Sequence, residues 1–143
     1  MEIEKLKMEH VEQVISLQRE LVDFALTDAQ ARERYREMMI RDDYFLAVAR
    51  EGDEILGTAT GIVCRALSMP FLVIEDVIVK TACRSMGIGG KLLAELDKFA
   101  MANRCQYAIL VSSGFRQDAH RFYEKQGYTE DVRGFRKGYE YTD

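Results

Sequence analysis

The stretch Val77-Ile-Val-Lys-Thr-Ala-Cys-Arg84-Ser-Met-Gly87-Ile-Gly89-Gly90-Lys-Leu-Leu93 follows directly on an almost continuously apolar run that begins at Phe71. An unbroken apolar run is typical of a strand buried on both faces, and the leucines at helical spacing predict a helix from Gly87 to about residue 103. The glycines between strand and helix let the backbone approach a ligand closely. Because the first amides of a helix lack internal partners and favour an anion, this loop predicts a phosphate or pyrophosphate site.

Two families of phosphate-binding loop are excluded by a single residue. The mononucleotide P-loop needs Ser or Thr after its lysine, and here Leu92 follows Lys91. The dinucleotide fingerprint needs a third glycine, and Leu92 occupies that position as well. Neither nucleotide-binding interpretation fits the loop.

A third pattern matches the same residues. Arg84-x-x-Gly87-x-Gly89 resembles the [QR]-x-x-G-x-[GA] signature of the GCN5-related N-acetyltransferases, the GNAT superfamily. About 35 residues later, Ala119-His-Arg-Phe122-Tyr123-Glu-Lys-Gln-Gly127-Tyr128 resembles the A-x-x-F-Y-E-K-x-G-[FY] pattern of the same superfamily. The resemblance covers essentially the whole chain and is sharpest over residues 72–128.

Outward from the loop, hydrophobic spacing predicts alternating strands and helices. The expected helices are 9–25, 28–40, 87–103 and 116–126, with Thr27 or Asp28 as a cap of the second. The expected strands are 2–7, 44–49, 55–64, 71–79, 107–111 and two more within 128–141 that turn near Gly134. Gly57 and Gly61 within a strand indicate a bulge or a close backbone approach.

The resemblance implies an α/β (α+β) fold in a single N-acetyltransferase domain over residues 1–143. Its central sheet would be mixed, mostly antiparallel and twisted, with about seven strands, about four helices, and fourth and fifth strands that splay apart. Acetyl-CoA, the implied co-substrate, enters that gap.

The resemblance also implies which residues bind acetyl-CoA. The backbone of Val77, Ile78 and Val79 would pair with the pantetheine arm as an added strand does. The pyrophosphate would be held by the amides of the loop, which comprises Arg84, Ser85, Met86, Gly87, Ile88, Gly89 and Gly90. Ala119, Phe122 and Tyr123 would line the other side of the thioester. Arg116 stands where many relatives carry an asparagine, so it is a candidate contact for a CoA phosphate.

Three residues are candidates for the chemistry. Tyr123 stands where relatives place a tyrosine near the sulfur, and a phenol can protonate a leaving thiolate. An amine attacks only as the neutral base, so Glu75 or a water chain would accept its proton. Asp76 would point to the opposite face of a regular strand, and both carboxylates are candidates for binding the amine. The alternatives are that Tyr123 is a core aromatic and Glu75 a structural carboxylate.

Composition narrows the class of protein. The chain has 143 residues, which is one domain's worth, and a net charge of −4, which argues against a general nucleic-acid-coating protein. Three cysteines form no disulfide framework, and the two histidines lie in no metal-ligand cluster. No signal-peptide pattern and no apolar run of about 20 residues is present, so we expect a soluble cytoplasmic protein without a membrane or metal partner.

The acceptor of the acetyl group stays open between three hypotheses. The first is a small primary amine, such as a polyamine, an amino acid or an aminoglycoside-like compound. The second is a terminal amine or lysine of a protein or peptide. The third is a catalytically silent module that binds acetyl-CoA. A homodimer is compatible with the resemblance, because many relatives pair through their C-terminal strands.

Overall fold

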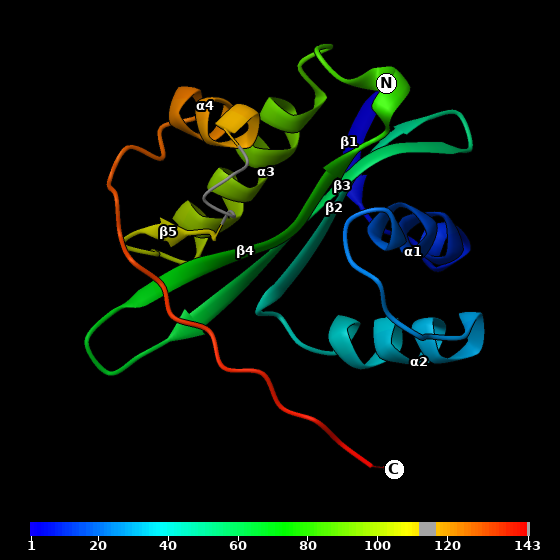
Figure 1. Ribbon diagram of the computed structural model, residues 1–143, viewed down its shortest axis with the longest axis horizontal. Coiled ribbons are helices and arrows are strands. Elements are labelled where there is room, and N and C mark those ends of the chain that lie inside the picture. Colours follow the sequence, from blue (N-terminus) through cyan, green and yellow to red (C-terminus); the bar gives the residue numbers. More distant parts are fainter. Residues whose placement is uncertain (112–116, 143) are drawn as a thin grey trace. The chain divides into compact units, whose positions relative to one another are not determined.

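The computed structural model describes residues 1–111 and 117–142 (Figure 1). The chain divides into two compact units, Met1–Leu110 and Val111–Asp143, which we call unit 1 and unit 2. Unit 1 contains the sheet and the first three α-helices, whereas unit 2 contains one α-helix and the C-terminal tail.

The sheet of unit 1 has five strands in the order β1-β2-β3-β4-β5. Neighbouring strands from β1 to β4 pair antiparallel, and β5 pairs parallel to β4. The strands are β1 (Glu2–Lys5), β2 (Tyr44–Glu51), β3 (Glu54–Arg65), β4 (Pro70–Val79) and β5 (Ala108–Ile109). The chain thus has the expected α/β architecture with a mixed sheet, but five strands in the described residues instead of about seven.

Four α-helices complete the described fold, as expected. They are α1 (Val11–Arg19), α2 (Asp28–Met39), α3 (Ile88–Ala102) and α4 (Gln117–Lys125). Two short 3-10 turns, η1 (Met8–His10) and η2 (Thr81–Cys83), precede α1 and α3. In unit 1, α1 and α2 lie on one face of the sheet and α3 lies on the other (Figure 1).

Close packing of α3 against β3 explains the two glycines of that strand. A Cβ atom at Gly57 would lie 3.1 Å from the Ile78 carbonyl oxygen and 3.3 Å from side-chain atoms of Ile88 and Leu92. A Cβ atom at Gly61 would lie 3.1 Å from the Leu96 side chain. The expected close approach is confirmed at both glycines. Residues with larger side chains at these positions would keep α3 away from β3.

The first helix is shorter than the sequence predicts. It ends at Arg19 instead of residue 25, and Leu21 and Val22 beyond it are exposed. The next helix, α2, begins after Thr27, where Thr27 and Gln30 form a capping box. In a continuous helix the backbone amides of these two residues would bond to carbonyl oxygens of the preceding turn, whereas here they bond to the side chains of the capping box. Local hydrogen bonding therefore overrides the apolar periodicity.

The two strands expected in the tail are absent, and residues 129–142 form no strand or helix. The segment is charged and contains Gly134 and Gly138, and its large apolar side chains, Val132, Phe135, Tyr139 and Tyr141, are exposed. A two-stranded hairpin alone is marginally stable in water. The expectation of two strands that turn near Gly134 is therefore wrong for the described residues of the tail.

Candidate active site

A bulge interrupts β4 where it crosses the middle of β3. Thr58 pairs with Ile78 and Thr60 with Glu75, so Asp76 and Val77 together face a single residue of β3. Asp76 has a φ of +54°, in the left-handed region. Asp is one of the few residues besides glycine that tolerate this conformation, which a bulged strand often requires.

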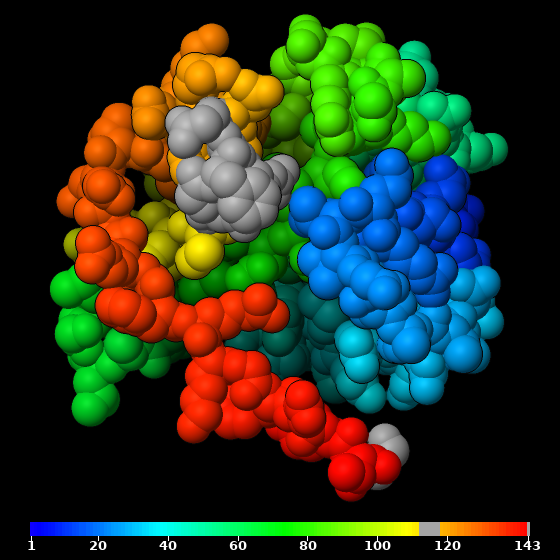
Figure 2. All heavy atoms as spheres, in the orientation of Figure 1, coloured from blue at the N-terminus to red at the C-terminus, as the bar shows by residue number. Residues whose placement is uncertain are grey.

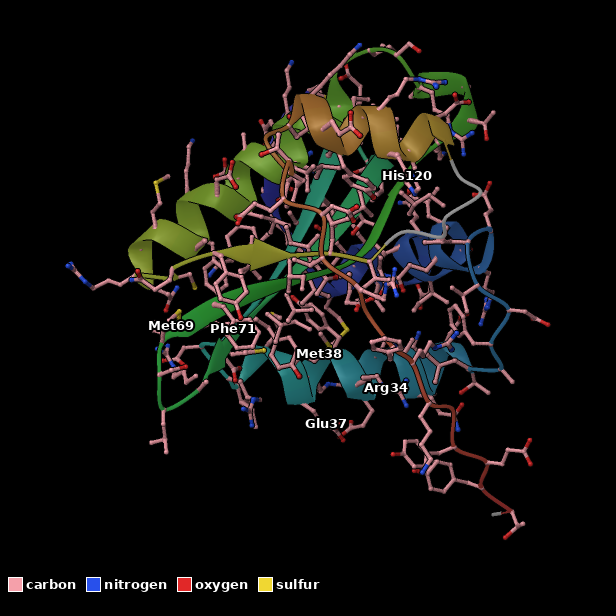
Figure 3. All side chains as sticks on the ribbon, turned by 60° about the vertical axis from the view of Figure 1, so that its left-hand side comes forward. Arg34, Glu37, Met38, Met69, Phe71 and His120 are labelled. Atoms are coloured by element: carbon pink, nitrogen blue, oxygen red, sulfur yellow. The ribbon has the colours of Figure 1, made fainter. Side chains whose placement is uncertain are left out.

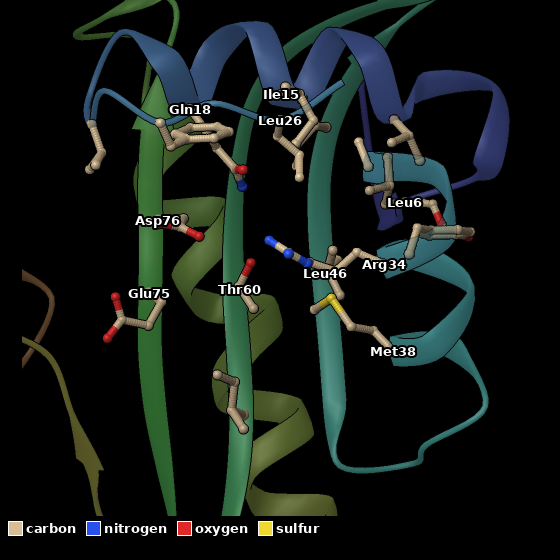
Figure 4. Close-up of a pocket in the computed structure, with 17 residues that line it drawn as sticks. Leu6, Ile15, Gln18, Leu26, Arg34, Met38, Leu46, Thr60, Glu75 and Asp76 are labelled. Atoms are coloured by element: carbon tan, nitrogen blue, oxygen red, sulfur yellow. The ribbon is translucent and has the colours of Figure 1, made fainter. Parts of the chain in front are cut away.

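The bulge brings Glu75 and Asp76 to the same cavity. Both residues line a hollow of about 460 Å³ on the sheet face covered by α1 and α2. The expectation of opposite faces applied to a regular strand, and the extra residue breaks the regular alternation here. Figure 4 shows the Asp76 carboxylate directed across the cavity toward β3, and that of Glu75 on the other side of β4.

The rest of the cavity lining is mostly apolar. Its other polar side chains are Gln18 of α1, Arg34 and Tyr35 of α2, and Thr60 of β3. Arg34 projects from α2 and directs its guanidinium toward Thr60 and Asp76 (Figure 4). The apolar lining consists of Leu6, Val11, Val14, Ile15, Val22, Phe24, Leu26, Ala31, Met38, Leu46 and Ile62.

Helix α2 is held in place by its own contacts. The Tyr35 hydroxyl donates a hydrogen bond to the Leu6 carbonyl oxygen at 2.6 Å, and Met38 is half-buried against the core of unit 1. Figure 3 shows Met38 on the side of α2 facing the sheet, whereas Glu37 lies on the outer side. Arg34 is exposed, but it lies three residues after buried Ala31 and four before Met38, so the helical repeat places it beside the inward face, where it lines the cavity.

Both cavity carboxylates are harder to ionise than usual. Burial raises the pKa of Asp76. Partial burial, and then the negative charge of Asp76, raise the pKa of Glu75. A raised pKa brings a carboxylate closer to neutral pH, where it accepts a proton more effectively.

The edge of β4 that faces β5 is open beyond its first residues. Only Leu72 and Val73 pair with β5, so the stretch from Ile74 to Val79 has no partner strand there in the described chain. The expected divergence of the fourth and fifth strands is confirmed. Unpaired backbone amides and carbonyls along this stretch can bind an extended ligand as a further strand would.

The glycine-rich loop leads from this edge to the start of α3. Ser85 and Gly87 have positive φ values of 69° and 79°, and no side chain caps the helix. Residues 84–87 before this fifteen-residue helix are exposed, and Figure 2 shows this part of the chain at the surface, so the first amides of the helix are available to a ligand. Arg84 and Lys91 are exposed beside them, so the residues present fit an anion such as a pyrophosphate.

The second motif forms α4 in unit 2. Ala119, Phe122 and Tyr123 are half-buried, and the Phe122 and Tyr123 rings lie 5.2 Å apart. The Tyr128 ring contacts Tyr123 edge-on at 6.1 Å, and its amide donates to the Tyr123 carbonyl oxygen. The predicted contact Arg116 lies outside the described residues.

Residues 11–128 match the model of the acetyltransferase (GNAT) family, so the chain belongs to this family of enzymes. Members of the family use acetyl-CoA. Among residues 1–111 and 117–142, no group of three or more His, Cys, Asp or Glu side chains could hold a metal ion. In the same residues, no helix has the length and apolar character needed to cross a membrane.

Two curated relatives come from Bacillus subtilis strain 168. The uncharacterized N-acetyltransferase YhfO is 26% identical over 109 residues, which cover 74% of this chain and 73% of that protein. The uncharacterized N-acetyltransferase YhdJ is 38% identical over 65 residues, 45% of this chain and 46% of that protein. The second match thus spans less than half of the relative's length.

Solved structures share the fold over nearly the full chain. A putative acetyltransferase from Agrobacterium tumefaciens C58 has a TM-score of 0.89 at 22% identity, covering 97% of this chain and 100% of that one. Glucosamine-6-phosphate N-acetyltransferase from Arabidopsis thaliana has a TM-score of 0.86 at 24% identity, covering 97% and 98%. AAC(6')-Iy was solved with a bisubstrate analogue that joins CoA to an acetylneamine. It has a TM-score of 0.79 at 19% identity, covering 96% of this chain and 97% of that one.

Sequence reasoning did not identify Gln18, Arg34 and Thr60 as lining residues of the cavity. The sequence does contain one indication for Arg34, because this cation lies at helical spacing from apolar residues of the same predicted helix. Gln18 and Thr60 carry no comparable signal, because their place depends on how α1 packs against the strands.

Proposed function

We propose that the chain transfers the acetyl group of acetyl-CoA to the primary amine of a small molecule. The observation that carries this proposal is the bulge in β4, which brings Glu75 and Asp76 to one cavity beside the strand's unpaired edge. An acyl donor held along that edge would place its reacting end next to an amine in the cavity. Proximity of this kind supplies a large part of the rate enhancement in two-substrate reactions.

The donor would be held by backbone groups. Val77, Ile78 and Val79 belong to the open edge of β4 and would bind the pantetheine arm. The amides from Arg84 to Gly90 would bind the pyrophosphate, with the positive end of α3 favouring its charge. Ala119 and Phe122 of α4, and Arg116, are proposed as further contacts with the co-substrate.

Glu75 is the proposed general base, and Asp76 is proposed to bind the amine beside it. The amine nitrogen attacks the thioester carbonyl carbon, a C–N bond forms and the C–S bond breaks. Glu75, directly or through water, takes the proton that the nitrogen loses. The raised pKa of the Glu75 carboxylate supports this role, since it makes that group a stronger proton acceptor.

Tyr123 is the proposed general acid. The leaving thiolate needs a proton, and a phenol hydroxyl can donate one as charge develops on the sulfur. The support is the match of the segment from Ala119 to Tyr128 with the family pattern. We also propose that units 1 and 2 act as one acetyltransferase domain, because the family match spans both. A cytoplasmic location and a homodimer stay predictions of the sequence.

The test is release of free thiol from acetyl-CoA with panels of small amines and short peptides, and a blank without acceptor. We expect thiol release with a class of small amines. Glu75→Gln and Tyr123→Phe should each lower kcat by about 10²-fold or more, as expected for loss of a general base or acid. The Glu37→Gln variant is the matched control, because Glu37 is an exposed carboxylate on the outer face of α2.

Other results would replace the proposal. Turnover of peptides alone would indicate a protein N-acetyltransferase. Stabilisation of the fold by acetyl-CoA without transfer to any acceptor would indicate a binding module. Unchanged turnover in Glu75→Gln would remove Glu75 from the mechanism and favour a water chain.

A further inference from the structure

Arg34 is the cationic side chain of the cavity. Its guanidinium extends from α2 toward Thr60 and Asp76 (Figure 4). Among residues 1–111 and 117–142, no hydrogen bond and no ion pair within 4.0 Å holds it. The two neighbouring arginines of α2 differ, since Arg32 pairs with Glu12 and Arg36 pairs with Glu33.

The cavity thus presents both charges on an apolar background. Carboxylates lie on the β4 side, a guanidinium enters from α2, and the apolar lining includes Ile15, Leu26 and Leu46. A guanidinium offers several N–H donors in a planar fork that matches a carboxylate, and such charge-assisted bonds are strong ones. A ligand that satisfies the whole cavity carries an amine, an anionic group and an apolar body.

We propose that the acceptor is an amino carboxylate with an apolar skeleton, whose carboxylate binds Arg34 and whose amine faces Asp76 and Glu75. This inference rests on the proposed function and names the substrate class of the same site. A polyamine fits less well, because its second ammonium would meet the positive charge of Arg34. A sugar fits less well, because its hydroxyls would lose water against an apolar wall without gaining partners.

The experiment measures binding by calorimetry, which does not require acetyl transfer. Each probe is an amino carboxylate paired with the same amine lacking the carboxylate. The pairs are leucine with 3-methylbutylamine, phenylalanine with 2-phenylethylamine, and 6-aminohexanoate with pentylamine; spermidine is tested alongside. The proteins are the unmodified chain, Arg34→Met, and Arg36→Met as the control that removes an equal charge from the outer side of α2.

In at least one pair, we expect the carboxylate to tighten binding about tenfold, the size of effect that hydrogen bonds between charged groups produce. Arg34→Met should abolish this difference, and Arg36→Met should keep it. Circular dichroism checks that α2 remains folded in both variants. The inference is overturned if no carboxylate tightens binding to the unmodified chain, or if Arg34→Met keeps the difference.

The two proposals can fail separately. Acetyl transfer to spermidine or simple amines, with no carboxylate preference, would keep the transferase and reject the amino carboxylate. Arg34-dependent binding of an amino carboxylate, with no transfer to any acceptor, would keep the ligand class and reject the transferase.

Discussion

Asp76 combines a partly buried charge with a φ of +54°. Burial raises its pKa in the folded state, so ionised Asp76 destabilises the fold at any pH above that raised value. Below the pKa of the unfolded chain the group is neutral in both states, and this cost vanishes. Asparagine is never charged and also tolerates a left-handed backbone. Asp76→Asn should therefore raise the Tm near pH 8.

The Tm gain in Asp76→Asn should shrink as the pH falls toward about 4, where the aspartate itself becomes protonated. Thermal unfolding followed by circular dichroism across this pH range measures the effect. Asp42→Asn is the control, because Asp42 is exposed. A constant gain at all pH values would show that removal of the charge is not its cause.

The same substitution should change the pH dependence of catalysis. The charge of Asp76 contributes to the raised pKa of Glu75, so its removal lowers that pKa. If Glu75 is the base, the acidic limb of the kcat/KM profile in Asp76→Asn moves to lower pH. Initial rates over the acidic range measure the shift. An unmoved limb, with binding of the amine weakened, would assign the limb to another group.

These residues show where sequence reasoning reached its limit. Glu75 and Asp76 were recognised as candidates, but their shared cavity depends on a bulge defined by the register between β3 and β4. A register is a relation between two strands, so the order of residues in one strand does not reveal it. Arg34 became a candidate only once α2 was packed beside the sheet.

At the scale of the elements, the N-terminus of α3 depends on Gly87. Its φ of +79° is unfavourable for a residue with a Cβ, although a Cβ there would meet no atom within 4 Å. Gly87→Ala should thus cost about 1 kcal/mol of unfolding free energy through backbone strain alone. It should also weaken acetyl-CoA binding, because relief of that strain would move the first amides of the helix.

Gly52 provides the matched control for Gly87. It lies in the turn between β2 and β3, has a φ of +58°, and also has nothing within 4 Å of an added Cβ. Gly52→Ala should cost a similar free energy in urea unfolding but leave the Kd of acetyl-CoA unchanged. Equal losses of affinity in the two variants would mean that the loop before α3 has no special part in binding.

The contact between α3 and β3 predicts unequal costs at two glycines. An added Cβ at Gly57 meets a backbone oxygen of β4, which cannot move without disturbing the sheet. At Gly61 it meets the ends of the Leu96 and Leu72 side chains, which can rotate. Gly57→Ala should therefore cost about 1–3 kcal/mol in urea unfolding, and Gly61→Ala less. Gly138→Ala, in open space, should be neutral; an equal cost at Gly57 and Gly61 would contradict the packing argument.

The elements themselves were largely predictable where burial imposes a strong pattern. The strands now seen as β2, β3 and β4 and the helix α3 begin and end within a few residues of their predicted bounds. The prediction failed at the end of α1, where a capping box takes over, and in the tail. Neither place has the continuous burial that makes periodicity informative.

At the scale of the whole molecule, the proposal of a single domain implies that units 1 and 2 both bind acetyl-CoA. The family match includes the loop before α3 in unit 1 and all of α4 in unit 2. If both units hold the co-substrate, saturating acetyl-CoA should slow amide hydrogen exchange from Val77 to Gly90 and also within α4. A ligand at about 100 times its Kd stabilises the state that binds it by about 2.7 kcal/mol, which such exchange rates readily detect.

The Gly87→Ala variant serves as the control at the same concentration of acetyl-CoA. Weaker binding should reduce the added protection in both units together, because one ligand is responsible for both. Protection confined to unit 1 would contradict the single-domain proposal and would remove Tyr123 from the reaction. Equal protection in the unmodified chain and the variant would instead reject the loop before α3 as part of the binding site.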